Sequence, residues 1–221
     1  MQNSIKAVFF DLDNTILDRT RMFGDFTNAF LGHYFNHLES TQPVFDRMME
    51  LDLDGYKDRN VLFAELLAEL PWRESLTHAD LAEYYKREFI KHAILMDQAA
   101  DVISYIRGKY RTGLITNGRN AVQYGKIDQL GIRDAFEFIL VSEEAGVKKP
   151  DARIFQMAID KLQVAPEECI YVGDHPINDI EGASMSGMGT IWIRGKHNWN
   201  DALKAKPLHT IDQLNELFRL L

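Results

Sequence analysis

The sequence predicts an α/β protein in which a Rossmann-like core with a parallel sheet is interrupted by a helical insert. The run at residues 5–10 is apolar and rich in β-formers, as expected of a strand buried on both faces. From about Asp97 onwards, strand-like and helix-like segments alternate, which favours a parallel sheet with right-handed crossovers. Between about Arg19 and Ala93, every strong pattern is helical. The insert therefore follows the first strand.

The insert shows the three- and four-residue periodicity of amphipathic helices over three segments, at residues 23–34, 61–70 and 81–90. Thr77 precedes the third segment and has a side chain that suits an N-cap. At roughly 75 residues the insert has the size of a small domain. We assign the chain to two domains, a core of residues 1–17 and 95–221 and a helical domain of residues 18–94.

The second half of the chain supplies the remaining elements of the core. The expected strands lie at residues 112–115, 138–141, 169–172 and 190–193. The expected helices lie around residues 102–106, 122–130, 153–162, 178–186 and 211–221. Gly131 and Gly187 follow two of these helices and suit their C-terminal ends.

Composition excludes several classes of protein. The chain has 221 residues, of which 46% are hydrophobic and 26% charged, an ordinary globular balance. A net charge of −8 gives no basic footprint for nucleic acid. No apolar run is long enough to span a membrane, and the first residues do not resemble a secretory signal. The single cysteine, Cys169, fits a reducing cytoplasm, where we expect the protein to reside.

Polar residues follow three of the predicted strands. Asp11 and Asp13 come after the first strand, Thr116-Asn117-Gly118 after the second, and Asp174 and Asp179 after the strand that begins at Cys169. The carboxyl ends of parallel strands form one edge of a sheet, so these clusters should converge. Four carboxylates in a small volume repel one another unless a cation compensates them. Their all-oxygen chemistry points to Mg²⁺.

Each cluster also has an ordinary structural interpretation. Asp11 and Asp13 suit a turn, Asn117-Gly118 is a common turn dipeptide, and Asp174 suits the cap of the next helix. Lys149 would bring a fixed positive charge to the same edge. The order of the clusters, each at a strand end or a helix start, favours one shared site.

Taken together, these residues resemble the four motifs of the haloacid dehalogenase (HAD) superfamily. The motifs are matched in order by Asp11-Leu12-Asp13-Asn14-Thr15, Thr116-Asn117-Gly118, Lys149-Pro150-Asp151, and Gly173-Asp174 through Asn178-Asp179. The insert resembles the helical C1 cap of subfamily I, so the resemblance covers nearly the whole chain. The motif set is specific for the superfamily and not for a substrate.

The resemblance implies a role for each motif residue. Asp11 would be the nucleophile, and Asp13 the general acid and then the general base. Mg²⁺ would be held by Asp11, the Asp13 backbone carbonyl and Asp174. Asp179 would not bind the ion directly but would orient a metal-bound water and the Lys149 side chain. The phosphoryl oxygens would be held by four residues, Thr116, Asn117, Gly118 and Lys149.

An acid at Asp13 favours hydrolysis of phosphomonoesters, because a halide leaves without a proton and an alkoxide does not. We therefore expect a Mg²⁺-dependent phosphatase of a small phosphorylated metabolite, such as a nucleoside monophosphate or a sugar phosphate, working as a monomer or homodimer. The alternatives are a phosphomutase and a non-catalytic phosphate-binding regulatory module. The cap would select the substrate, and its candidate residues are Arg19, Phe23, His33 and Tyr34.

Overall fold

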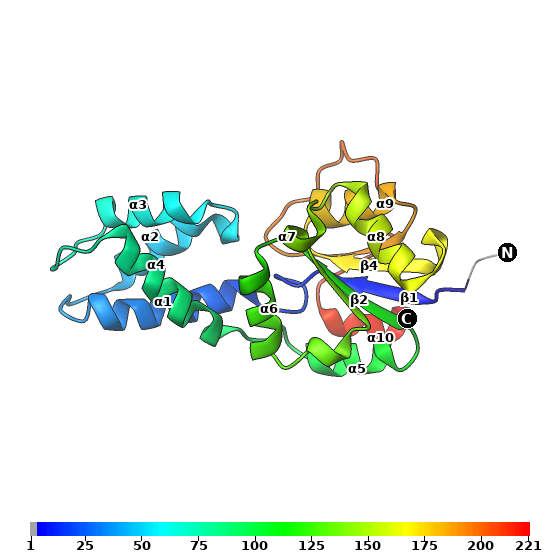
Figure 1. Ribbon diagram of the computed structural model, residues 1–221, viewed down its shortest axis with the longest axis horizontal. Helices are drawn as coiled ribbons and strands as arrows, with labels where there is room; N and C mark the ends of the chain where they lie inside the picture. The colour runs from blue at the N-terminus through cyan, green and yellow to red at the C-terminus, as the bar shows by residue number, and fades with distance from the viewer. Residues whose placement is uncertain (1–3) are drawn as a thin grey trace. The chain divides into compact units, whose positions relative to one another are not determined.

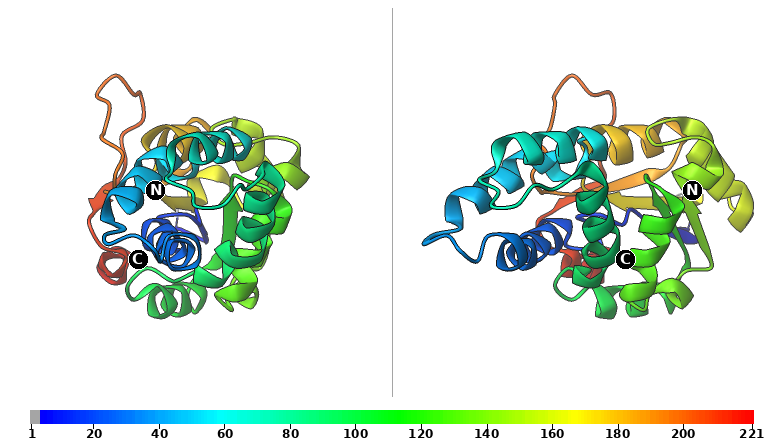
Figure 2. Two further views of the ribbon diagram at one scale, coloured as in Figure 1. Left: turned by 90° about the vertical axis from the view of Figure 1, so that its left-hand side faces the viewer. Right: turned by 60° about the vertical axis from the view of Figure 1, so that its left-hand side comes forward.

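The computed structural model describes residues 4–221 and contains two compact units (Figures 1 and 2). One unit, the core, joins the chain up to Asp18 with Leu95–Leu221, and the other, the helical unit, is Arg19–Ile94. The strands of the core are β1 (Ala7–Phe10), β2 (Arg111–Thr116), β3 (Phe138–Val141), β4 (Cys169–Gly173), β5 (Gly189–Ile193) and β6 (His209–Ile211). Its helices are α5 (Ala99–Arg107), α6 (Asn120–Gln129), α7 (Ser142–Ala145), α8 (Ala152–Leu162), α9 (Gly182–Met185) and α10 (Leu217–Leu220).

The six strands form one sheet in the order β3-β2-β1-β4-β5-β6, and all neighbouring pairs are parallel. Helices α8 and α9 cover one face of the sheet, and α5 and α10 cover the other (Figure 1). All four residues of β1 are fully buried, which explains its unbroken apolar sequence. The predicted α/β class with a parallel, Rossmann-like sheet is confirmed.

The strand order places a reversal between β1 and β4. Strands β2 and β3 extend the sheet from one side of β1, whereas β5 and β6 extend it from β4 on the other side. In open α/β sheets the connections diverge at such a point and leave a crevice beyond the carboxyl ends of the two central strands. The carboxyl ends of β1 and β4 are therefore the place where this fold favours a ligand.

The C-terminal segment differs from the prediction of one helix over residues 211–221. Ile211 instead belongs to β6, where it pairs with Ile193 of β5 at the edge of the sheet. The Glu216 carboxylate accepts hydrogen bonds from the backbone N–H groups of Asp212 and Gln213. These contacts hold the chain in a turn, so helical structure begins only at Leu214.

The helix expected at residues 178–186 begins earlier than predicted. A π-helical turn, Pro176–Glu181, leads directly into α9. His175 caps this turn, because its Nδ1 atom accepts hydrogen bonds from the N–H groups of Ile177 and Asn178, both at 3.1 Å. The predicted end of the helix is correct, with Gly187 at a φ of +87°.

The helical unit contains four α-helices in its described residues, α1 (Arg19–Tyr34), α2 (Gln42–Asp52), α3 (Arg59–Glu69) and α4 (His78–Glu88). Thr77 caps α4 as predicted, with the reciprocal Asp80 contact of a capping box. Helix α2 was not predicted, and Gln42 and Pro43 at its start mark a favourable first turn. Nowhere in residues 4–221 is a helix long and apolar enough to cross a membrane.

Candidate active site

The site begins where β1 and β4 end side by side. Asp11 is the first residue after β1, and its N–H donates to the carbonyl of Val172 on β4, at 2.9 Å. Asp174 is the first residue after β4, and its own carbonyl accepts a hydrogen bond from the Trp192 indole at 2.8 Å. Both carboxylates are buried, with exposed fractions of 7% and 5%. The reversal of strand order thus brings the first and fourth motifs together.

Asp179 reaches the same place from the π-helical turn. One carboxylate oxygen from each of Asp11, Asp174 and Asp179 lies within 4.8 Å of the others. The close approach of Asp179 depends on Gly173, where a Cβ atom would lie 2.5 Å from the Asp179 Cγ. Asp179 is further held by the His175 N–H, which donates to its Oδ2 at 2.9 Å. Gly173 therefore makes room for the third carboxylate.

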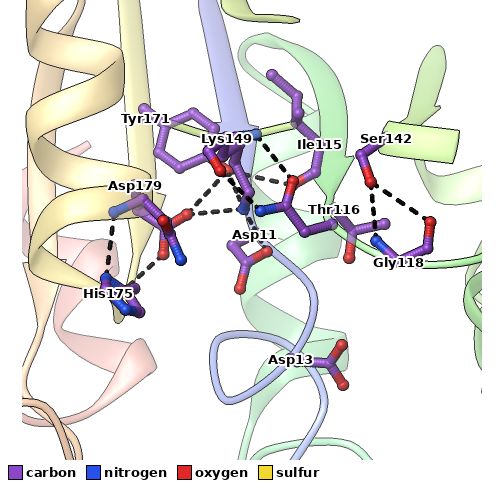
Figure 3. Close-up of polar contacts among 12 residues, drawn as sticks. Asp11, Asp13, Ile115, Thr116, Gly118, Ser142, Lys149, Tyr171, His175 and Asp179 are labelled. Carbon is purple, nitrogen blue, oxygen red and sulfur yellow. Dashed lines mark hydrogen bonds and ion pairs between the residues drawn. The ribbon is translucent and has the colours of Figure 1, made fainter. Parts of the chain in front are cut away.

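Lys149 joins this cluster from the loop before α8 (Figure 3). Its Nζ atom donates to Asp11 Oδ1 at 2.6 Å, to Asp179 Oδ1 at 2.7 Å and to the Tyr171 hydroxyl at 2.9 Å. The three hydrogens of the ammonium are accounted for by these three acceptors. The Tyr171 hydroxyl in turn donates to the Ile115 carbonyl at 3.1 Å. Lys149 is therefore held by the loop after β1, by β4 and by the π-helical turn.

Burial sets the protonation of this cluster. It raises the pKa of Asp11 from 3.8 to about 7, against the lowering effect of the Lys149 ammonium. Burial alone would lower the pKa of Lys149, but the charges of Asp11 and Asp179 hold it well above its ordinary value. Lys149 is therefore charged at neutral pH, whereas ionisation of Asp11 is opposed.

The donor set fits a hard divalent cation. Three carboxylates and one ammonium carry a formal charge of −2, which a single divalent ion neutralises. The carboxylates offer oxygen ligands, which Mg²⁺ and Ca²⁺ prefer over nitrogen or sulfur. Charge and ligand type thus agree with the expectation of a metal at this edge of the sheet.

The second motif is tied to the third by paired hydrogen bonds. Asn117 Oδ1 accepts from the Lys149 N–H at 2.9 Å, and Asn117 Nδ2 donates to the Lys149 carbonyl at 3.0 Å. The Gly118 N–H donates to Ser142 Oγ at 3.0 Å. Phosphate binding by Thr116, Asn117, Gly118 and Lys149 stays a prediction.

Asp13 lies apart from the carboxylate cluster, on the loop that leaves β1 (Figure 3). Its carboxylate accepts two hydrogen bonds from Lys126 Nζ, at 2.7 and 2.9 Å, and one from Gln123 Nε2 at 2.9 Å. Gln123 also donates to Thr116 Oγ1 at 2.5 Å. The predicted acid/base residue therefore has its own cationic partner, separate from Lys149.

We did not predict from the sequence that Gln123, Lys126 or Tyr171 belongs to the site. The first two lie three residues apart on α6, a spacing that places them on one face of a helix. That spacing, one turn after the second motif, is the signal that would have indicated them. Tyr171 lies two residues before Gly173 on a buried strand, where a hydroxyl needs a partner.

The substrate-selecting candidates of the helical unit divide into two groups. Arg19 and Phe23 are buried, and the Arg19 guanidinium makes two hydrogen bonds to the buried Asp52 carboxylate. Arg19 is thus engaged in the packing of this unit. His33 is exposed and Tyr34 is half-buried, with their ring centroids 4.5 Å apart. These two remain accessible candidates.

Comparison with known proteins identifies the family. The model of the haloacid dehalogenase-like hydrolases matches residues 8–193. The chain belongs to this family, as the four motifs indicated.

Among its relatives, a glyceraldehyde 3-phosphate phosphatase of Pyrococcus furiosus is 30% identical, over 98% of this chain and 93% of the relative. The pyrimidine 5′-nucleotidase YjjG of Escherichia coli is 27% identical, over 97% of this chain and 96% of the relative. Of the solved structures, YfnB of Bacillus subtilis bound to magnesium has a TM-score of 0.83 at 25% identity and covers 99% of each chain. The similarity to these proteins extends over both units of the chain.

Proposed function

We propose that this protein is a Mg²⁺-dependent phosphatase that hydrolyses a small phosphomonoester through an aspartyl-phosphate on Asp11. The observation that carries the proposal is the convergence of Asp11, Asp174 and Asp179 with the Lys149 ammonium at the reversal of strand order. Phosphoryl transfer to a side chain needs a nucleophilic oxygen and fixed positive charge around the transferred group. This cluster supplies the nucleophile, one ammonium and the ligands for a cation.

The reaction has two balanced halves. In the first, an Asp11 oxygen attacks phosphorus, the bond from phosphorus to the leaving oxygen breaks, and Asp13 gives its proton to that oxygen. In the second, water attacks phosphorus, Asp13 takes the proton, and the bond from phosphorus to Asp11 breaks. Inorganic phosphate and the alcohol are released, and both aspartates return to their starting state.

The remaining groups bind and orient the phosphoryl group. The Thr116 hydroxyl, the Asn117 N–H and the Lys149 ammonium would donate to its oxygens. Asp179 would hold Lys149 in place, because its Oδ1 is bound by Lys149 and its Oδ2 by the His175 N–H. The paired contacts of Asn117 with the Lys149 backbone support the same arrangement.

Mg²⁺ would be held by the Asp11 and Asp174 carboxylates and by the backbone carbonyl of Asp13. When bound there, such an ion would supply positive charge to the phosphoryl oxygens. The formal charge of −2 in the cluster of Asp11, Asp174, Asp179 and Lys149 supports a divalent ion.

Selection of the substrate would belong to the helical unit. The core groups named above serve the phosphoryl group and its protons, which all phosphomonoesters share. The names of the relatives refer to glyceraldehyde 3-phosphate and pyrimidine 5′-nucleotides, which are small phosphate esters. We therefore propose a nucleoside monophosphate or sugar phosphate as substrate, selected with His33 and Tyr34. The enzyme would act in the cytoplasm, as its single buried cysteine suggests, as a monomer or homodimer.

Phosphate release from a panel of phosphorylated metabolites tests the proposal. The wild type should release phosphate with Mg²⁺, lose this activity in EDTA and regain it when Mg²⁺ is restored. Asp11→Asn should reduce turnover by about 10³-fold or more, because it removes the attacking charge and keeps the shape. Asp134→Asn, the same change at an exposed position, serves as the control. Turnover by homogeneous Asp11→Asn enzyme near the wild-type rate would refute the covalent mechanism.

A further inference from the structure

Two polar side chains of α6 are buried beside the site without a role in the mechanism above. Gln123 is 2% exposed and Lys126 is 4% exposed. Burial of an ammonium or an amide costs free energy unless its hydrogen-bonding groups find partners. The partners found here are the side chains of Asp13 and Thr116, one from the first motif and one from the second.

These contacts are enough to use every hydrogen of the two side chains. Lys126 Nζ donates to both oxygens of Asp13, at 2.7 and 2.9 Å, and to Gln123 Oε1 at 2.9 Å. The Gln123 amide must therefore point its oxygen at Lys126, which leaves its NH₂ group facing Asp13 and Thr116. Three ammonium hydrogens and two amide hydrogens meet five acceptor contacts.

This arrangement fixes what Thr116 does. Its Oγ1 atom accepts from Gln123, so its one hydroxyl hydrogen is left to donate in another direction. A donor hydroxyl is what a phosphoryl oxygen requires. Gln123 therefore sets the Thr116 hydroxyl as a donor, whereas an acceptor side chain at position 123 would draw that hydrogen away.

Gln123 and Lys126 together also fix the direction of the Asp13 carboxyl group. The Asp13 side chain is 27% exposed, so packing alone does not enclose it. Three hydrogen bonds from α6 hold both of its oxygens instead. Proton transfer to a leaving oxygen needs the carboxyl within hydrogen-bond reach and in a defined direction.

We propose that Gln123 and Lys126 are positioning residues that hold Asp13 for proton transfer and Thr116 for phosphate binding. This inference rests on the proposed phosphatase function. It assigns Lys126 to the leaving-group side of the reaction and Lys149 to the nucleophile side. Loss of Lys126 should therefore impair proton transfer to the leaving group, whereas loss of Lys149 should lower the turnover of every substrate.

The test compares two probes that differ in their need for a proton, β-glycerophosphate and p-nitrophenyl phosphate. The alkoxide of the first must be protonated as it leaves, whereas p-nitrophenolate leaves without a proton. Lys126→Met should lower kcat for β-glycerophosphate by about 10- to 100-fold, with a much smaller loss for p-nitrophenyl phosphate and little change in KM. Lys126→Arg should restore part of the loss. Lys161→Met, at an exposed helical position, is the matched control.

A double-mutant cycle shows whether Lys126 acts through Asp13. In an Asp13→Asn background, Lys126→Met should lower kcat hardly any further, because the carboxyl group that Lys126 positions is already gone. If Lys126→Met fails to fold, Gln123→Leu with Gln129→Leu as control tests the same leaving-group preference.

Several outcomes would overturn the inference. Equal losses with both probes, or full additivity with Asp13→Asn, would show that the pair on α6 acts on stability or overall charge. If either of these outcomes is found while Asp11→Asn still abolishes turnover, the positioning role is rejected and the phosphatase function stands. A wild type that hydrolyses neither probe and no metabolite with Mg²⁺ would reject the proposed function, and the positioning role with it.

Discussion

Replacement of Asp11 by Asn should make the metal-free protein more stable at neutral pH. Burial raises the pKa of the Asp11 carboxyl from 3.8 to about 7, even though Lys149 lies 2.6 Å away. A carboxyl with a raised pKa favours the folded state while it is protonated, and this contribution is lost as the pH rises. Asparagine has the shape of the protonated acid and cannot ionise, so the variant keeps the contribution at all pH values.

The size of the effect follows from the two pKa values. Below pH 3.8 the carboxyl is protonated in both states, and above about pH 7 it is ionised in both. A rise from 3.8 to about 7 corresponds to about 4 kcal/mol of stability lost across that window. About 3 kcal/mol of this loss should fall between pH 5 and pH 8. Over that range the free energy of unfolding of Asp11→Asn should therefore rise relative to wild type by this amount.

Urea unfolding in EDTA, followed by circular dichroism between pH 5 and pH 8, measures the difference. Asp134→Asn should track the wild type at each pH, because its side chain is exposed. Addition of Mg²⁺ should stabilise the wild type more at pH 8 than at pH 5, since the metal and the proton compete for the carboxylates. A stability difference between Asp11→Asn and wild type that does not change with pH would refute the argument.

Two further predictions concern packing. Gly173→Ala should lower kcat about tenfold or more and cost about 1–3 kcal/mol of stability, because its Cβ would lie 2.5 Å from Asp179 Cγ. Steady-state kinetics check this prediction. The control is Gly32→Ala, where a Cβ meets nothing within 4 Å. Asp52→Asn should cost about 3–5 kcal/mol of stability, because it removes the charge of the buried carboxylate that binds both the Arg19 and the Arg59 guanidinium. Burial alone would raise the pKa of Asp52, but Arg19 lowers it, so wild type should lose this stability as the pH falls below 3.8, and the variant should not.

The parts of the fold that the sequence predicted are those set by local pattern. The first strand, expected at residues 5–10 and found at Ala7–Phe10, could be recognised because a strand buried on both faces is apolar throughout. The acidic residues could be grouped because Asp11 and Asp174 each follow such a strand directly. Parallel strands share one carboxyl edge, so neither inference required knowledge of which strands are neighbours.

The parts that could not be predicted depend on partners distant in the sequence. The sequence around Lys126 shows only a lysine on a helix. Its role depends on Asp13, which is 113 positions away in the sequence and which the fold brings into contact with it. The three residues of β6 form a strand only because the edge of β5 offers them a partner. Such an element is too short for its own sequence to show a period of two.

The chemistry proposed here requires two aspartates, only two positions apart, to behave differently. The nucleophile must be ionised when it attacks, whereas the acid must gain and lose a proton within one turnover. Asp11 is buried against Lys149, and Asp13 is partly exposed against Lys126, which comes from a different helix. Two separate lysines therefore give neighbouring carboxylates different environments. The two charges still interact, because the Asp13 carboxylate is one of the groups that raise the pKa of Asp11. The separation of Lys126 from Lys149 thus gives each carboxylate on this short loop a cationic partner of its own, which suits the two different roles proposed for them.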